Sequence, residues 1–88
     1  MKRLSNKEIL NELSLLNDWV LNDNQITKVY KLNSFMEVMS LANLVSDKSE
    51  QIDHHPKMVT DFNQIEFLMT THSEGGITKL DFMLAFFI

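Results

Sequence analysis

Three helix-start signals divide this 88-residue chain. Each is a hydroxyl residue followed three positions later by an acid, the spacing at which side chain and backbone cap each other in a first helical turn. The three pairs are Ser5 with Glu8, Ser34 with Glu37, and Thr78 with Asp81. The stretches between the predicted helices alternate apolar and polar residues around short turn sequences, so each of these stretches is predicted to form a β-hairpin.

The predicted order is helix, two strands, helix, two strands, helix. The segments are a helix from 5 to about 15, strands at 19–21 and 25–32, a helix from 34 to about 52, strands at 57–62 and 64–72, and a helix at 79–87. This order predicts one α+β domain over residues 1–88. We expect a two-layer sandwich, with a four-stranded antiparallel sheet and the helices packed on one face.

The second predicted helix carries more apolar surface than one contact requires. A helix that covers one face of a sheet needs an apolar stripe about 100° wide. Here the stripe of Phe35, Val38, Met39, Ala42 and Val45 is widened by Met36, Leu41 and Leu44. We therefore expect a second contact, most simply with another copy of the chain.

The charge balance and the lack of cysteine restrict the possible functions. Eight basic and twelve acidic residues give a net charge of −4, and the basic residues are scattered. Direct binding of nucleic acid is disfavoured, since it usually needs a clustered basic face. Without cysteine there is no disulfide and no thiolate chemistry. No apolar run approaches the length of a membrane span, so we expect a soluble cytoplasmic protein without membrane contact.

The three histidines, His54, His55 and His72, lie within one stretch between Glu50 and Asp81. Histidine is the side chain whose ordinary titration falls near neutral pH, so this stretch contains the parts needed for proton transfer. Without further context, a solvated pair in a helix-to-strand connection is the simpler interpretation. A metal site is disfavoured, because adjacent histidines on an extended chain project to opposite sides and no H-x-H or H-x-x-x-H spacing is present. We predict no metal.

The spacing within this stretch resembles the signature of the pterin-4a-carbinolamine dehydratases. The shared pattern is Glu50-x-x-x-His54-His55-Pro56, then Phe62, His72 and Asp81. Trp19, the segment 26–32, Phe35 and the ending Gly75-Gly76-Ile77-Thr78-x-x-Asp81-Phe82-x-x-Ala85 also resemble family positions in the same order. The likeness thus covers nearly the whole chain, and it favours a functional role for the histidines over a solvated one.

The resemblance implies a hydro-lyase that needs no cofactor. Members of this family remove water from a 4a-hydroxytetrahydropterin to give quinonoid dihydropterin, a step in tetrahydrobiopterin recycling. By the same resemblance, His54 and His72 would donate and accept protons at the 4a-hydroxyl, and His55 would orient the pterin. The segments Asp53-His54-His55 and Thr70-Thr71-His72 would line the substrate pocket.

Three further residues have a functional and a structural interpretation. Glu50 could orient or charge an imidazole, or it could be a solvent-facing helix residue. Asp81 belongs to the family pattern, but as the third helical residue after Thr78 it would cap the last helix in any case, and we place that structural role first. Trp19 would border the pocket or lie in the core.

Other functions stay open beside the enzyme. The family forms dimers and tetramers, so the resemblance implies a homodimer or homotetramer. Animal relatives also bind and stabilise dimers of a homeodomain transcription factor, so a non-catalytic dimerisation or coactivator module is the main alternative. A role in another pterin pathway, such as that of the molybdenum cofactor, is a third, because relatives assigned there share the motif.

Overall fold

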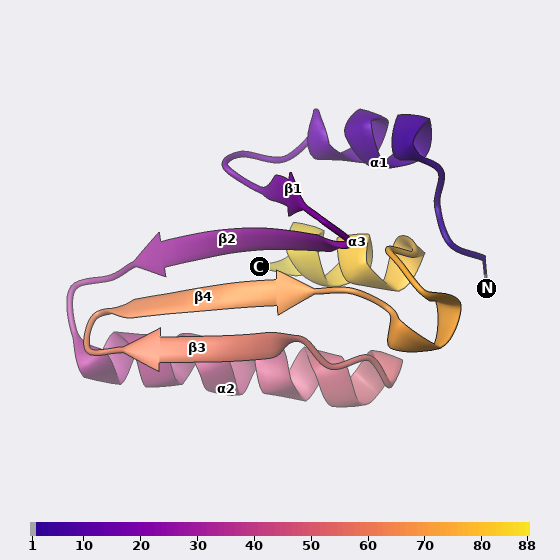
Figure 1. The fold of residues 1–88 in the computed structure, drawn as a ribbon. Helices are drawn as coiled ribbons and strands as arrows, with labels where there is room; N and C mark the ends of the chain where they lie inside the picture. The colour runs from indigo at the N-terminus through magenta and orange to yellow at the C-terminus, as the bar shows by residue number, and fades with distance from the viewer. Residues whose placement is uncertain (1) are drawn as a thin grey trace.

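A computed structural model describes residues 2–88 (Figure 1). Its elements are α1 (Asn6–Leu13), β1 (Val20–Asn22), β2 (Gln25–Lys31), α2 (Phe35–Ile52), β3 (Lys57–Asp61), β4 (Gln64–Met69), the short 3₁₀ helix η1 (His72–Glu74) and α3 (Lys79–Phe87). The strands form one antiparallel sheet in the order β1-β2-β4-β3. The predicted α+β order and four-stranded antiparallel sheet are confirmed.

The core lies between one face of this sheet and the helices. Alternation along β4 places Ile65, Phe67 and Met69 on the covered face, where all three are buried. Their neighbours in register on β2 include Ile26 opposite Met69. In Figure 1, α2 and α3 lie behind the sheet, and α1 joins the same core through Ile9. The opposite face of the sheet is left open.

The helix starts follow the predicted caps, with one difference. The capping boxes of α1 and α3 are reciprocal, as predicted. At α2, the Ser34 hydroxyl accepts from the Glu37 amide as expected, but the Glu37 carboxylate accepts from the amide of Asn33 rather than that of Ser34. Ser34 is more extended (φ −154°) than Ser5 (φ −73°), so the carboxylate meets the amide one residue earlier.

The strand predicted at 64–72 is too long, because β4 ends at Met69. Beyond it, Thr71 makes a single antiparallel bridge with Gly76, and the amides of Glu74 and Gly75 donate back to the carbonyls of Thr71 and His72. These local hydrogen bonds wind the chain into η1. His72 therefore opens a turn instead of ending a strand.

Other boundaries shift by one or two residues. The first helix ends at Leu13 rather than near 15, where the Ser14 hydroxyl donates to the Asn11 carbonyl. The strands predicted at 19–21, 25–32 and 57–62 are observed as β1, β2 and β3, and β3 stops at Asp61 because Phe62 turns the chain with a left-handed backbone (φ 48°). No helix within residues 2–88 has both the length and the hydropathy that a membrane crossing requires.

Candidate active site

The end of α2 separates the two adjacent histidines. Asp53 takes the left-handed conformation (φ 52°, ψ 47°), and the amides of Asp53 and His54 donate to the carbonyls of Glu50 and Ser49. These two bonds are a Schellman closure, which satisfies carbonyls that the last helical turn leaves free. The chain leaves the helix there in an extended form, so His54 and His55 point to opposite sides.

His54 points beneath the sheet to Asp81. Its Nε2 lies 2.6 Å from Asp81 Oδ1, and its side chain is only 11% exposed. An ionised carboxylate only accepts hydrogen bonds, so we assign the proton of this contact to Nε2. In a neutral His54, that assignment leaves Nδ1 as the basic ring nitrogen.

Asp81 ties three segments together. Its side chain is fully buried, and its Oδ2 accepts from the Thr71 hydroxyl at 2.8 Å and from the Thr78 amide at 2.9 Å. The two threonine hydroxyls are also 2.8 Å apart. Through these bonds one carboxylate joins the end of α2, the end of β4 and the start of α3. The capping role expected for Asp81 is thus present together with a contact to His54.

Glu50 pairs with His55, not with His54. The helix ends at Ile52, so the interval from Glu50 to His54 does not continue as a helical turn. Both partners are exposed, His55 by 55% and Glu50 by 78% of their side chains. An exposed ion pair of this kind stabilises a fold by little, about 0–1 kcal/mol. The contact therefore orients the His55 ring more than it stabilises the protein.

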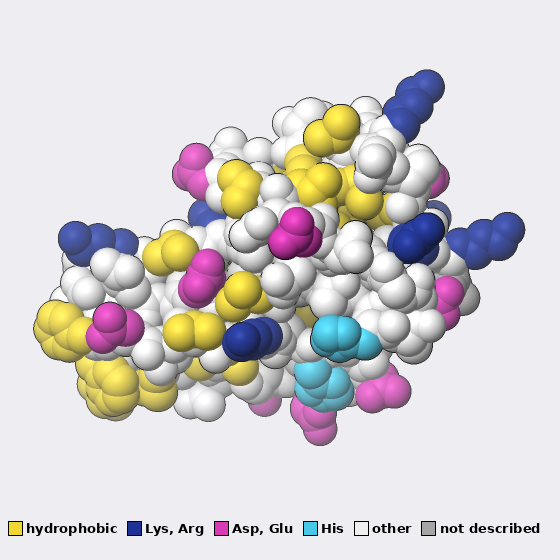
Figure 2. Space-filling model, in the orientation of Figure 1, with side chains coloured by type: hydrophobic (Ala, Val, Ile, Leu, Met, Phe, Trp, Pro, Cys, Tyr) yellow, Lys and Arg dark blue, Asp and Glu magenta, His cyan; other side chains and the backbone are white. Residues whose placement is uncertain are grey.

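His55 and His72 line the same cavity, of about 600 Å³. The cavity lies on the open face of the sheet, where β3 begins and β4 ends. Its floor includes Lys57, Leu68 and Thr70. Figure 2 shows histidine side chains together at this end of the open face, beside a basic side chain. We call this cavity the histidine pocket.

The far wall of the histidine pocket comes from two turns. One is the β1–β2 turn with Asp23, Asn24 and the following Gln25, and the other is the loop at Gly75 and Gly76. Polar residues from distant parts of the sequence thus surround the His55 and His72 rings in this pocket. Two imidazoles on one polar-lined cavity can exchange protons with a small molecule bound there.

The predicted site residues fall into two groups. His55, His72 and Thr70 meet in the histidine pocket. The others lie outside its lining: Asp53 is an exposed helix cap, His54 and Thr71 contact Asp81, Glu50 holds His55, and Trp19 is buried in the core.

Several lining residues were not predicted from the sequence. Leu68 could have been found from strand alternation, since it lies two residues before Thr70 on the same face. Lys57 could then follow from register, because it pairs with Leu68. Nothing in the sequence signals that Asp23 and Asn24 contribute, since their approach depends on how two separate hairpins pack.

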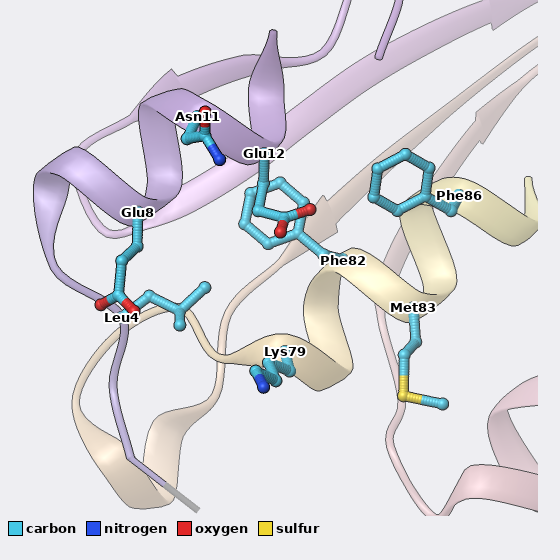
Figure 3. A pocket seen from close by; sticks show the side chains of 8 residues that line it. All are labelled: Leu4, Glu8, Asn11, Glu12, Lys79, Phe82, Met83 and Phe86. Carbon is cyan, nitrogen blue, oxygen red and sulfur yellow. The ribbon is translucent and has the colours of Figure 1, made fainter. Parts of the chain in front are cut away.

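A second cavity, of about 570 Å³, lies between α1 and α3 (Figure 3). Phe82, Met83 and Phe86 line it, together with Glu8 and Lys79. Hydrogen bonds from Ser5, with a smaller contribution from the charge of Lys79, lower the pKa of Glu8. This cavity has no histidine, so it lacks the groups that point to proton transfer near neutral pH.

Possible metal ligands do not cluster within residues 2–88. No group of three or more His, Asp or Glu side chains in this part of the chain is arranged to hold a metal ion. The split between His54 and His55 is one reason, because the two rings do not converge.

Comparisons with known proteins show which family the chain resembles over its length. The family described as pterin 4 alpha carbinolamine dehydratase matches residues 2–88. A relative from Sulfurisphaera tokodaii, provisionally named a pterin-4-alpha-carbinolamine dehydratase, is 38% identical over 97% of this chain and 91% of its own length. A relative from Picosynechococcus with the same provisional name is 36% identical over 94% of this chain and 90% of its own length.

A solved structure matches the fold as well. The transcriptional coactivator/pterin dehydratase from Brucella melitensis superposes with a TM-score of 0.92 at 30% identity, over 96% of this chain and 92% of that one. The sequence and fold matches both cover almost the full described length of the chain. The chain belongs to the pterin-4a-carbinolamine dehydratase family.

Proposed function

We propose that this protein is a hydro-lyase that dehydrates 4a-hydroxytetrahydropterins to quinonoid dihydropterins in tetrahydrobiopterin recycling, without a cofactor. The observation that carries the proposal is the convergence of His55 and His72 in one cavity on the open face of the sheet. The names of the relatives support it, because they refer to the same reaction.

The reaction needs an acid and a base on one small molecule. Hydroxide is a poor leaving group, so an acid protonates the 4a-hydroxyl as the C4a–O bond breaks and water departs. The lone pair of N5 forms the C4a=N5 double bond, and a base takes the proton from N5. Positioned acids and bases typically contribute 10²–10⁴-fold to such steps. Imidazole is the side-chain group that most readily both gives and takes a proton near neutral pH, so two imidazoles can serve both roles.

The geometry favours a particular division of these roles. His55 and His72 line the pocket, and we assign the proton exchange with the substrate to them. Glu50 acts through His55 by orienting its ring. His54 is mostly buried and bonded to Asp81, so we assign it a supporting structural role beside the pocket. Its Nδ1 is then the basic ring nitrogen. The family resemblance alone would instead give the proton exchange to His54 and His72.

The test is the rate of quinonoid dihydropterin formation from enzymatically generated 4a-hydroxytetrahydropterin. Wild type is compared with His55→Ala, His72→Ala and His54→Ala, and with Gln51→Ala as an exposed control on α2. We expect His55→Ala and His72→Ala to lose at least 10²-fold while remaining folded. A folded wild type that does not exceed the spontaneous rate would refute the function. A full rate in His55→Ala would refute the division of roles.

A second candidate function rests on the apolar face of α2. Phe35, Met36 and Leu44 are exposed there although large and apolar. Such a face fits burial against a partner, and we propose a homodimer or homotetramer as its first use. The Brucella melitensis protein is named both a coactivator and a dehydratase, so a further protein partner is compatible with the enzyme. Loss of assembly in Met36→Glu, with dehydration retained per folded chain, would separate the two functions.

A further inference from the structure

The cavity between α1 and α3 takes no part in the proposed reaction, and residues of these two helices form most of its lining (Figure 3). On α3 they are Lys79, Phe82, Met83 and Phe86, at the spacing i, i+3, i+4 and i+7, and on α1 they include Glu8 and Glu12, one turn apart. Residues at these spacings lie on one side of a helix. We call this cavity the α1–α3 groove.

The α1–α3 groove has the size of a small-molecule site. Its volume of about 570 Å³ falls within the range of about 300–1,000 Å³ that is typical of ligand pockets. Along each helix the lining residues extend over about two turns, or roughly 10 Å. That length is short for docking a helix of another protein, since stable protein interfaces bury about 1,200–2,000 Å² in total. The dimensions therefore favour a small molecule as the occupant.

The apolar part of the groove comes mainly from α3. Phe82 is buried, whereas Met83 and Phe86 are large apolar side chains that remain 47% and 48% exposed. A ligand with an apolar body would remove these exposed surfaces from water. Phenyl rings and a thioether sulfur also make favourable contacts with an aromatic ring. The α3 side of the groove therefore suits an aromatic group.

Glu12 is the polar side chain that most constrains the charge of a ligand. It is partly buried, and in Figure 3 it extends from α1 in the direction of α3. Within residues 2–88, no Lys or Arg side chain lies at ion-pair distance from its carboxylate. A carboxylate in this position, beside apolar side chains, is stabilised by a cationic hydrogen-bond donor.

The other charged residues of the groove add to this preference. The carboxylate of Glu8 accepts from the Ser5 amide at 2.9 Å. Hydrogen bonds from Ser5, with a smaller contribution from the charge of Lys79, lower the pKa of Glu8, so this residue is ionised at neutral pH. The charge of Lys79 therefore acts on Glu8, and the groove as a whole has two carboxylates against one ammonium group. A cation is favoured over an anion.

We propose that the α1–α3 groove binds an aromatic amine, with the ring against Phe82 and Phe86 and the ammonium group at Glu12. An ammonium group has several N–H donors and no acceptor, so it matches a carboxylate that lacks a partner. A neutral ligand with the same ring gains only the apolar contacts. An anionic one faces the two carboxylates of α1. This site is separate from the histidine pocket and does not depend on the dehydratase function.

The experiment compares three ligands that share a phenyl ring and differ in charge: 2-phenylethylamine, 2-phenylethanol and phenylacetate. Each is titrated into the full chain, and binding is followed by the shifts of backbone amide resonances in ¹H–¹⁵N NMR spectra. We expect the shifts to lie in α1 and α3, and the amine to bind roughly 3- to 10-fold tighter than the alcohol, the effect of one partly exposed charged hydrogen bond. Phenylacetate should bind weakest. Raising the salt concentration from about 0.05 M to about 0.5 M should reduce the advantage of the amine.

Two variants of matched charge assign the effect to Glu12. Glu12→Gln keeps the shape of the side chain, and it should remove the advantage of the amine while leaving the affinity for the alcohol unchanged. Asp47→Asn removes one negative charge from an exposed position on α2, and it should keep the advantage. Circular dichroism spectra confirm that both variants are folded.

A third variant tests the apolar side of the groove. Phe86→Ala should weaken the amine and the alcohol by a similar factor, roughly 3-fold, because both lose the same contact. If this variant does not fold, the positions of the shifts in wild type still locate the ligand. The proposal is overturned by equal affinities for amine and alcohol, by tightest binding of phenylacetate, by an unchanged advantage in Glu12→Gln, or by shifts outside α1 and α3. Absence of saturable binding for all three ligands overturns it as well.

Discussion

Replacing Asp81 by alanine is expected to cost about 3–5 kcal/mol of folding free energy. The carboxylate is fully buried and accepts three contacts, from His54 Nε2, the Thr71 hydroxyl and the Thr78 amide. Each buried group that loses its partner costs about 1–3 kcal/mol, although the Thr71 and Thr78 hydroxyls can still bond each other. Three donors lose this acceptor, and the remaining bond between the two hydroxyls offsets part of the cost, so the total is about 3–5 kcal/mol.

This loss is large for a chain of 88 residues. At about 0.05–0.15 kcal/mol per residue, the whole fold is stable by only about 4–13 kcal/mol. With a urea m-value of about 1 kcal/mol/M, the unfolding midpoint should fall by about 3 M or more. Urea unfolding followed by far-UV circular dichroism measures this shift. Asp47→Ala, which removes an exposed carboxylate from α2, is the control and should change the midpoint little.

The isosteric variant Asp81→Asn separates folding from chemistry. Its carbonyl oxygen can still accept from the Thr78 amide, so we expect a smaller loss of about 1–3 kcal/mol. Its NH₂ group would then take the place of Oδ1 and face His54 Nε2. There it would require Nε2 as an acceptor and would move the ring proton to Nδ1. A midpoint shift below about 1 M in Asp81→Ala would refute the view that this carboxylate holds the three segments together.

Two smaller effects follow from the helix ends. The pKa of Glu8 is lower in the folded than in the unfolded chain. Ionised Glu8 therefore stabilises the fold at a pH above its ordinary pKa of about 4.5. This stabilisation is lost as the pH falls from about 4.5 through the pKa of the folded state. Urea midpoints measured from pH 6 to pH 3 should fall less in Glu8→Gln than in wild type, and parallel curves would contradict the assignment. Asp53 holds a left-handed backbone (φ 52°) that glycine adopts without steric cost, so Asp53→Gly should raise stability by up to about 1 kcal/mol. Biopterin affinity should stay unchanged in that variant, and a clear loss of affinity would show that the Asp53 side chain contacts the pterin.

The local signals in the sequence predicted most of the fold. Hydroxyl–acid pairs marked the starts of α1, α2 and α3, and alternating apolar and polar residues marked the two hairpins between them. The errors lie where local hydrogen bonding competes with strand pairing. The bend after Met69 is such a place, because the amides of Glu74 and Gly75 bond to carbonyls three residues back, which alternation of residue types does not reveal.

The site was less accessible to sequence reasoning, because its contacts join distant segments. The residue types were identified, but the partner of each histidine was not. His54 bonds to a carboxylate 27 positions away, whereas Glu50, the nearer candidate, bonds to His55. The spacing of Glu50 and His54 matched a helical turn, and only the helix end at Ile52 breaks that relation. Pairings of this kind depend on where a helix stops and on which strand lies beside it.

The end of α2 therefore explains why two adjacent histidines serve different purposes. On a continuous helix, residues 54 and 55 would lie about 100° apart and could share one environment. The left-handed turn at Asp53 ends the helix, and the extended chain after it sends His54 beneath the sheet and His55 to the open face. One ring is then anchored by a buried carboxylate, and the other stays exposed to a ligand. Pro56 follows with a fixed φ and directs the chain into β3, so the positions of both rings are set by backbone geometry before any substrate binds.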